Sequence, residues 1–87
     1  MSLPLNSSLI RGVEEDSEGV IWIAADHGGL NLLDKKTETI RYLKNNPFDL
    51  RSISQNSVIS LYKDDTGIIW TGTYKNGINY YHETSMK

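Results

Sequence analysis

The sequence predicts an all-β fold built from about two four-stranded antiparallel sheets. Two observations lead to this prediction. The chain contains an internal repeat, because Trp70 lies 48 positions after Trp22 and the residues around the two tryptophans match. Each copy also consists of short apolar stretches separated by turn-forming residues, which is the pattern of strands joined by tight turns.

The repeat places identical residues at the same offset in both copies. The chain has only two tryptophans, and each follows a glycine by three positions. Chance is therefore a poor explanation, and we interpret the matched positions as a structural repeat. The identical pairs are Asp16 with Asp64, Gly19 with Gly67, Ile21 with Ile69, Trp22 with Trp70, Gly29 with Gly77 and Asn31 with Asn79.

The first hairpin of each copy is predicted from three short segments. The segments "SLIRGVEE" and "SVISLYKD" alternate well enough for a strand with one preferred face. The tetrapeptides "DSEG" and "DDTG" follow, with Asp first and Gly last, as type I turns prefer. The next segments, "VIWIA" and "IIWTG", are apolar at consecutive positions, which predicts a strand covered on both faces.

Further strands are predicted in the second half of each copy. The dipeptides at Gly28–Gly29 and Asn76–Gly77 indicate two-residue hairpin turns, since a type I′ turn requires positive φ at both central residues. "LNLLD" and "INYYH" form the third strand, and Thr39–Leu43 forms a fourth in the first copy. A helix over "LNLLDKKTETIRYLKN" is the alternative. Two strands are favoured because the matching "INYYHETS" has no helical stripe.

Four turn-linked strands per period of 48 residues, with the second strand covered on both faces, are typical of a β-propeller blade. We therefore expect about two four-stranded antiparallel blades of a β-propeller, as a fragment with seven strands and no helix. Residues 1–7 are expected to form a leader, residues 8–44 the first blade, residues 45–55 the linker and residues 56–87 a second, incomplete blade.

Composition excludes several classes of function. The 87 residues carry a net charge of −2, so the chain has no basic field that would attract nucleic acid. The longest apolar stretch, Val20–Ala25, is too short to cross a bilayer, and no secretory signal opens the chain. The chain has no cysteine. It also contains no common catalytic motif and no calcium-loop motif, so neither an enzymatic activity nor a cofactor nor a metal is expected.

The segment from Ser8 to Tyr81 resembles the two-component regulator propeller repeat, whose pattern is close to N-x-V-x-x-I-x-x-D-x-x-G-x-I-W-I-G-T-x-x-G-G-L. The first copy departs from it, with Ser8 in place of Asn, Ala24 in place of Gly and Ala25 in place of Thr. The second copy fits better. Its matching residues are Asn56, Val58, Leu61, Asp64, Gly67, Ile69, Trp70, Gly72, Thr73, Gly77 and Ile78.

The resemblance implies a role in signal transduction. Such repeats occur in periplasmic sensor regions of hybrid two-component systems of Bacteroides-type bacteria, where propellers detect glycan fragments and signal to a histidine kinase. By this resemblance the chain is a fragment of a periplasmic, ligand-sensing propeller, with an oligosaccharide as ligand.

Two alternatives remain open: a purely structural pair of blades, and a fragment of a propeller lyase or hydrolase. An enzyme would need a His and a carboxylate converging at the central rim. Only Asp26 and His27 offer these, and adjacent strand-end residues tend to point apart.

Candidate ligand-binding residues lie at the hairpin tips that follow the second strand of each copy. Asp26 and His27 occupy the first tip, and Tyr74 and Lys75 occupy the matching positions of the second. These four residues differ between copies while the surrounding frame does not, which is expected where loops carry binding residues. The alternative interpretation is four solvated turn residues.

The remaining candidates are interpreted mainly as structural. Trp22 and Trp70 are expected to pack between blades rather than to stack on a sugar ring. The side chains of Asp16 and Asp64 are expected to accept backbone N–H bonds from the next two residues. His82 is expected to be an isolated surface residue. Four aromatic residues are equally compatible with a carbohydrate groove and with a covering of the blade surface: Tyr42, Phe48, Tyr80 and Tyr81.

The predicted fold also implies partners. Two blades bury only one interface between them, so their outer faces expose apolar surface that isolated monomers rarely tolerate. In a parent chain, other blades would cover these faces. For the isolated chain we expect a homo-oligomer, formed by edge-strand pairing or by rings of blade pairs.

Overall fold

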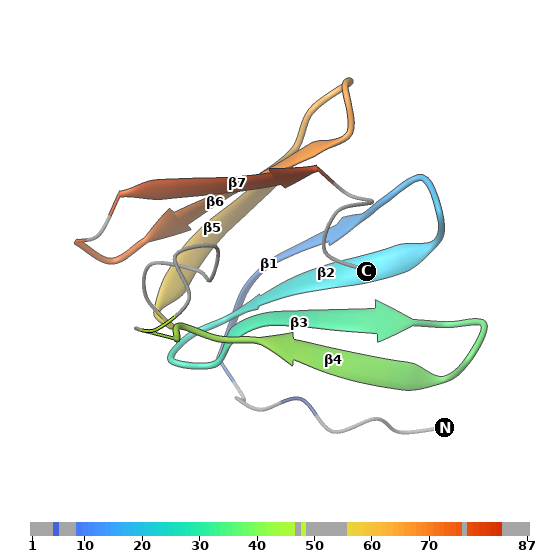
Figure 1. Cartoon of the computed structure of the whole chain (residues 1–87), viewed down its shortest axis with the longest axis horizontal. Coiled ribbons are helices and arrows are strands. Elements are labelled where there is room, and N and C mark those ends of the chain that lie inside the picture. The colour runs from blue at the N-terminus through green and yellow to red at the C-terminus, as the bar shows by residue number, and fades with distance from the viewer. Residues whose placement is uncertain (1–4, 6–8, 47, 49–55, 76, 83–87) are drawn as a thin grey trace.

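The computed structural model describes residues 5, 9–46, 48, 56–75 and 77–82, which form two antiparallel sheets and contain no helix (Figure 1). The first sheet has the order β1-β2-β3-β4 and the second the order β5-β6-β7. The strands are β1 (Ile10–Glu15), β2 (Val20–Ala25), β3 (Gly29–Asp34), β4 (Thr39–Leu43), β5 (Val58–Lys63), β6 (Ile68–Thr73) and β7 (Ile78–His82). The all-β prediction with seven strands is confirmed, and the helical alternative for the segment of β3 and β4 is wrong.

The two sheets are built alike, down to their irregularities. The first two strands of the second sheet begin and end 48 residues after those of the first sheet. In β1 the pairing register shifts between Ile10 and Gly12, and in β5 it shifts at the matching place, between Val58 and Ser60. A bulge re-aims the side chains that follow it. The repeat seen in the sequence is therefore a repeat of backbone geometry as well as of residue type.

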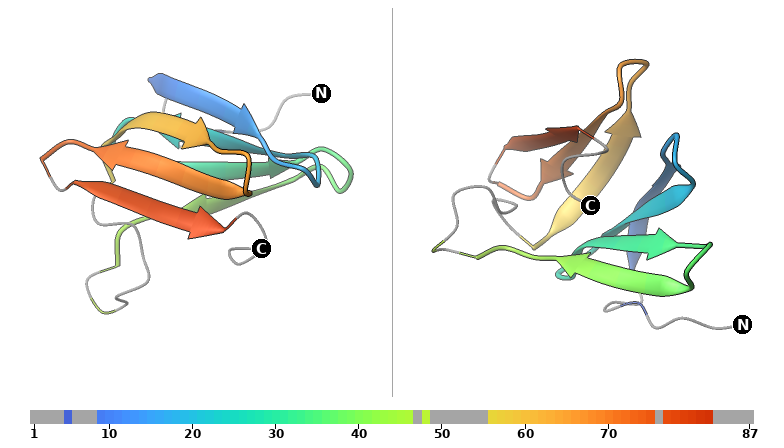
Figure 2. Two further views of the ribbon diagram at one scale, coloured as in Figure 1. Left: turned by 90° about the horizontal axis from the view of Figure 1, so that it is seen from above. Right: turned by 45° about the vertical axis from the view of Figure 1, so that its right-hand side comes forward.

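The core lies between the sheets, which diverge from a shared inner region (Figure 2). There β1 and β2 pack against β5. At Gly12 an added Cβ would lie 3.1 Å from the Cβ of Leu61, so glycine is what allows β1 to approach β5 so closely. The buried cluster of the core consists of Val20, Trp22, Ala24, Leu30, Leu32, Val58 and Ile69.

The two tryptophans have different surroundings. Trp22 is fully buried, and its ring stacks on Tyr81 of the second sheet with centroids 6.5 Å apart. Burial raises the pKa of the Tyr81 phenol. Trp70 is 39% exposed, so the expectation that both tryptophans pack between blades is wrong for Trp70. The expectation that β6 is covered on both faces fails for the same reason: among the described residues, no further sheet lies on the face that carries Trp70.

Each first hairpin is closed by an aspartate at its turn. Asp16 Oδ1 accepts the backbone N–H groups of Glu18 (2.9 Å) and Val20 (3.0 Å), and Oδ2 accepts the indole Nε1–H of Trp22 (2.8 Å). Asp64 accepts the same three kinds of bond, including that from the Trp70 indole at 2.8 Å. The donor two residues after each aspartate is as expected, and a further donor lies four residues after each aspartate. The bond to the indole was not expected from the sequence.

The hairpin tips after β2 and β6 differ from the predicted two-residue turns. The N–H of Gly28 donates to the carbonyl of Ala25 (2.9 Å), so the turn spans residues 25–28. Positive φ falls on His27 (64°) and Gly29 (70°) rather than on two adjacent glycines. His27 occupies the third turn position, where a type II turn requires positive φ. The matching residues Lys75 and Gly77 also have positive φ (76° and 79°), and Asn76 lies outside the described residues.

Gly29 and Gly77 offer a matched test of how closely the start of β3 approaches the end of β4. An added Cβ would overlap the carbonyl oxygen of Leu43 at Gly29, whereas at Gly77 it would meet nothing within 4 Å. We expect Gly29→Ala to lower the free energy of unfolding by about 2 kcal/mol and Gly77→Ala by about 1 kcal/mol, since both strain φ and only the first displaces the end of β4. Urea denaturation followed by circular dichroism measures both. Equal losses would mean that the contact at Gly29 contributes nothing.

Candidate functional site

The two predicted tips lie at the same end of the molecule. β2 and β6 run antiparallel to β1 and β5, so the ends of β2 and β6 lie beside the starts of β1 and β5, on the left in Figure 1. The N–H of Asp26 donates to the carbonyl of Leu9 (2.9 Å), and the N–H of Tyr74 donates to the carbonyl of Ser57 (3.0 Å). We call the group of side chains at this end the rim surface. Its members are Arg11, Asp26, His27, Ser57, Tyr74 and Lys75.

Ser57 links the two tips. Its Oγ lies 3.0 Å from Nδ1 of His27, and its carbonyl oxygen accepts the N–H of Tyr74. The residue directly before β5 therefore contacts the tip of the first sheet through its side chain and the tip of the second sheet through its backbone. The structure thus brings residues of both predicted pairs to one place. The sequence did not single out Ser57, although it directly precedes the predicted strand at Val58.

Asp26 is held by a cation that sequence reasoning also missed. Its Oδ2 lies 3.2 Å from Nη2 of Arg11, and its side chain is 13% exposed. Arg11 lies on β1 and its side chain remains 49% exposed. The available sequence signal was that β1 pairs with β2, which places an early β1 residue beside the residue that follows β2.

Asp26 and His27 lie closer together than expected. His27 Nε2 is 3.8 Å from Asp26 Oδ1, so the expectation that these neighbours point apart is wrong. Side chains alternate only in extended backbone, and His27 has left-handed backbone (φ 64°). Ser57, His27 and Asp26 consequently stand in the order of a nucleophile, a base and an orienting acid.

This arrangement does not have the geometry of a nucleophilic relay. A distance of 3.8 Å between His27 and Asp26 is too long for a hydrogen bond, and the His27 side chain is 83% exposed. The close partner of the Asp26 carboxylate is Arg11 rather than the imidazole. A triad needs its base to be oriented by the acid and shielded from water. The arrangement therefore suits recognition of polar groups better than catalysis.

Tyr74 and Lys75 form the second half of the rim surface. The Lys75 ammonium lies 5.2 Å from the centroid of the Tyr74 ring, and Tyr74 is 56% exposed. This cation–π contact positions the flexible lysine beside the rigid ring. The rim surface consequently combines an aromatic ring, two cations, a carboxylate, an imidazole and a hydroxyl within two adjacent hairpins.

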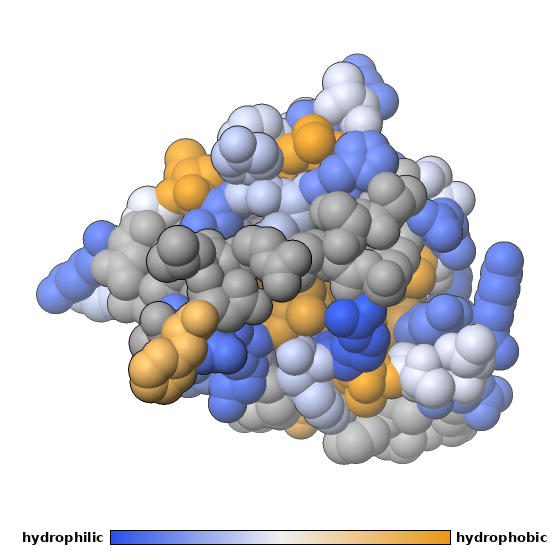
Figure 3. Space-filling model, viewed as in Figure 1, coloured by the Kyte–Doolittle hydropathy of each residue, from blue (hydrophilic) through white to orange (hydrophobic). Residues whose placement is uncertain are grey.

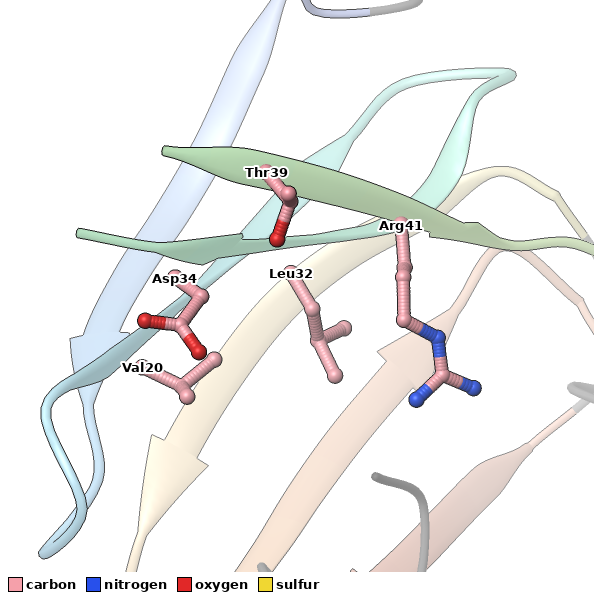
Figure 4. Close-up of a pocket in the computed structure, with 5 residues that line it drawn as sticks. All are labelled: Val20, Leu32, Asp34, Thr39 and Arg41. Atoms are coloured by element: carbon pink, nitrogen blue, oxygen red, sulfur yellow. The ribbon is translucent and has the colours of Figure 1, made fainter. Parts of the chain in front are cut away.

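A shallow pocket of about 220 Å³ lies elsewhere, on the first sheet (Figure 4). Its lining side chains project from β2, β3 and β4, and they are Val20, Leu32, Asp34, Thr39 and Arg41. The Asp34 carboxylate accepts the N–H of Lys36 (2.9 Å), so it takes part in the β3–β4 turn. This turn lies at the opposite end of the sheet from the rim surface (Figure 1). No predicted site residue lines the pocket.

The other predicted aromatic residues do not join the rim surface. Tyr81 is half-buried against Trp22, whereas Tyr80 is 65% exposed and lies 5.3 Å from the Trp70 ring centroid. Tyr42 and Phe48 are exposed, and so is His82 at the end of β7. No group of three His, Cys, Asp or Glu residues suited to a metal ion occurs within the described ranges. Those ranges also hold no helix of the length and hydropathy that spanning a membrane requires.

Comparison with known proteins points to one family. A sequence profile of the two component regulator propeller matches residues 4–27 and 52–75, which together make up more than half of the chain. Among solved structures, the chain is similar to the extracellular domain of a putative hybrid two component system from B. thetaiotaomicron, with a TM-score of 0.77 and 28% identity. The match covers 92% of this chain and 12% of that domain, so this chain spans only a small part of its length. A comparison with curated proteins gave no match.

Proposed function

This chain belongs to the two-component regulator propeller family, and from that premise we propose that it is a ligand-sensing module of a hybrid two-component sensor, with an oligosaccharide as ligand. The similar solved domain is the extracellular domain of a putative hybrid two component system, which supports an extracytoplasmic, periplasmic location. In this proposal the histidine kinase lies in another part of the system, and the chain itself recognises without catalysing.

The observation that carries the proposal is that the side chains of the rim surface differ between the two copies, whereas the backbone that holds them is the same. The two hairpins share their pairing register, and His27 and Lys75 share a positive φ. The side chains at these positions nevertheless differ, with Asp26 and His27 in one hairpin and Tyr74 and Lys75 in the other. If folding required particular side chains at these positions, both copies would carry the same residues there, as they do at the aspartate of the turn and at the tryptophan.

The chemistry of the rim surface matches that of a sugar chain. Oligosaccharides present hydroxyl groups that both donate and accept hydrogen bonds. Arg11 and Lys75 are donors only, the Asp26 carboxylate is an acceptor, and Ser57 can act as either. The exposed ring of Tyr74 offers a flat apolar surface with a polar edge, to which a pyranose ring can pack.

The test is a titration of the ¹⁵N-labelled chain with neutral gluco-oligosaccharides and with uronic-acid oligosaccharides, observed by NMR. We expect shifts confined to residues 26–28, 57, 74 and 75, and a loss of affinity of about tenfold or more in both His27→Ala and Lys75→Ala. Lys36→Ala is the matched control, because Lys36 is an exposed residue of the β3–β4 turn, at the other end of the sheet.

Three outcomes would count against parts of the proposal. Unchanged affinity in both tip variants would remove the rim surface as the binding site. Shifts around Val20 and Arg41 would place the ligand in the pocket of the first sheet instead. An absence of binding across both sugar classes would favour the alternative of a purely structural pair of blades, and shortening of the oligosaccharides during the titration would favour a lyase or hydrolase.

A further inference from the structure

A bulge in the first strand of each sheet directs one extra residue toward the rim surface. The pairing register shifts around Arg11 in β1 and around Ile59 in β5. A bulge leaves one residue outside the regular pairing and re-aims its side chain. In the first sheet, Nη2 of Arg11 lies 3.2 Å from Oδ2 of Asp26, the residue directly after β2. The bulge therefore joins a residue of the first strand to the residue that follows the second strand.

The second sheet carries apolar residues at the same two positions. At the offset of 48 residues, Ile59 matches Arg11 and Tyr74 matches Asp26. The backbone bond that anchors Asp26 recurs at Tyr74, so the two positions are held alike in both sheets. Ile59 is 45% exposed and Tyr74 is 56% exposed. We call Ile59 and Tyr74 the apolar pair. Both members thus differ together between the copies, with an ion pair in one sheet and the apolar pair in the other.

The rim surface also contains a cation without a carboxylate partner. The charge of Arg11 is neutralised by Asp26, whose other oxygen faces His27. The Lys75 ammonium instead lies 5.2 Å from the centroid of the Tyr74 ring, and within the described part of the chain no carboxylate forms an ion pair with it. An exposed positive charge thus lies directly beside the apolar pair. Figure 3 shows the mixed character of this end of the molecule: on the left, hydrophobic residues reach the surface beside strongly hydrophilic ones.

We propose that the rim surface selects an oligosaccharide in which the sugar unit on the apolar pair carries a negatively charged group, either a carboxylate or a sulfate. The flat face of this sugar packs on Tyr74 and Ile59, and the charged group at the edge of its ring pairs with the Lys75 ammonium. Ile59 is then a specificity-determining residue, because it widens the apolar surface that the sugar covers. The inference rests on the proposed function, since it presupposes that the rim surface binds a sugar chain.

The parts of the rim surface contribute to selection in different ways. Arg11 and Asp26 compensate each other's charge, so together they add hydrogen-bonding groups rather than a net charge. The apolar pair holds acidic and neutral sugars alike, because its contacts do not depend on charge. Lys75 therefore decides between the two kinds of sugar. An exposed ion pair changes affinity by up to about fivefold, so the expected preference is modest and weakens with salt.

Two matched pairs of trisaccharides test the proposal. Trigalacturonic acid is compared with its methyl ester, and sulfated maltotriose with maltotriose, so that each pair differs in negative charge and the two pairs separate carboxylate from sulfate. NMR titration of the ¹⁵N-labelled chain gives the dissociation constant of each trisaccharide. We expect the acidic member of at least one pair to bind about three- to fivefold more tightly at low ionic strength, and the difference to disappear at high salt.

Substitutions assign the preference to its residues. Lys75→Gln is expected to lower the affinity for the acidic member more than for the neutral one, so that the preference disappears, whereas Lys75→Arg is expected to retain it. Ile59→Ser is expected to weaken the binding of both members alike, by about threefold, because it removes apolar contact and no charge. Lys36→Gln is the matched control, since it removes an exposed cation at the other end of the sheet. Circular dichroism verifies that each variant folds.

The outcomes separate this inference from the function on which it rests. Equal affinities within both pairs of trisaccharides would overturn the inference and leave sugar binding standing, and so would a preference that survives in Lys75→Gln. Unchanged affinities in Ile59→Ser would remove Ile59 from the site. Binding of none of the trisaccharides would count against the proposed function as well as against this inference.

Discussion

Trp22→Ala is expected to lower the free energy of unfolding by about 4 kcal/mol, the range that the loss of a buried tryptophan spans. Trp22 is fully buried and stacks on Tyr81, so its removal leaves a cavity between the two sheets. A chain of this size has about 5–10 kcal/mol of stability in total. The variant is therefore expected to be partly unfolded at moderate temperature, which urea denaturation followed by circular dichroism would show.

Trp70→Ala is the matched control, because the same residue type forms the same indole bond at the same repeat position. Trp70 is 39% exposed, so its removal leaves no enclosed cavity within one molecule, and we expect a loss of about 1–2 kcal/mol. Both variants should be compared at one low protein concentration, since any association would add to the stability of the folded chain. Equal losses in dilute solution would contradict the different burial of the two indoles.

Asp16→Ala is expected to be nearly as damaging, with a loss of about 3 kcal/mol. The Asp16 carboxylate is buried and accepts three hydrogen bonds, including one from the buried Trp22 indole. Removing it leaves the N–H of the indole and that of Val20 without an acceptor in a place that water does not reach, and such groups are costly to leave unpaired. Thermal and urea denaturation measure the loss.

Asp64→Ala is the control for this substitution and has a pH dependence of its own. Hydrogen bonds from the Thr66 hydroxyl and the Trp70 indole hold the pKa of Asp64 well below its usual 3.8. A lowered pKa in the folded chain adds stability that is present above pH 3.8 and is lost as the pH falls through the folded-state pKa. We expect a smaller loss than for Asp16→Ala at neutral pH, and a stability that falls less with acid than in the unmodified chain. A loss equal to that of Asp16→Ala would contradict the role of burial.

Much of the fold was predictable because its signals are local. The turn residues and the apolar stretches place each strand, and a repeat confirms each assignment with a second copy. The burial of Trp70 was not predictable in this way. Both tryptophans lie in similar apolar stretches. Whether a tryptophan is buried depends on whether another sheet packs on its face of the strand, and the residues of one strand do not show this. For the same reason, the expectation of a strand covered on both faces held for β2 and failed for β6.

The candidate site was predictable in position and only partly in composition. The tips after the second strands were identified because their residues differ between copies, and Asp26, His27, Tyr74 and Lys75 do lie at one end of the molecule. Arg11 and Ser57 were missed, because Arg11 reaches the rim surface from β1 and Ser57 from the position just before β5. The bonds from Asp16 and Asp64 to the indoles cross a hairpin. Their one sequence signal was the equal spacing of aspartate and tryptophan in both copies.

The left-handed backbone at His27 and Lys75 has a consequence for how such a surface changes. Glycine adopts these dihedral angles without strain, so a side chain at each position costs about 1 kcal/mol. The bonds that anchor Asp26 and Tyr74 join backbone atoms, which are the same for every amino acid. Exchange of one non-glycine residue for another at either tip therefore alters the chemistry that the molecule offers its surroundings while its scaffold and its stability stay nearly constant.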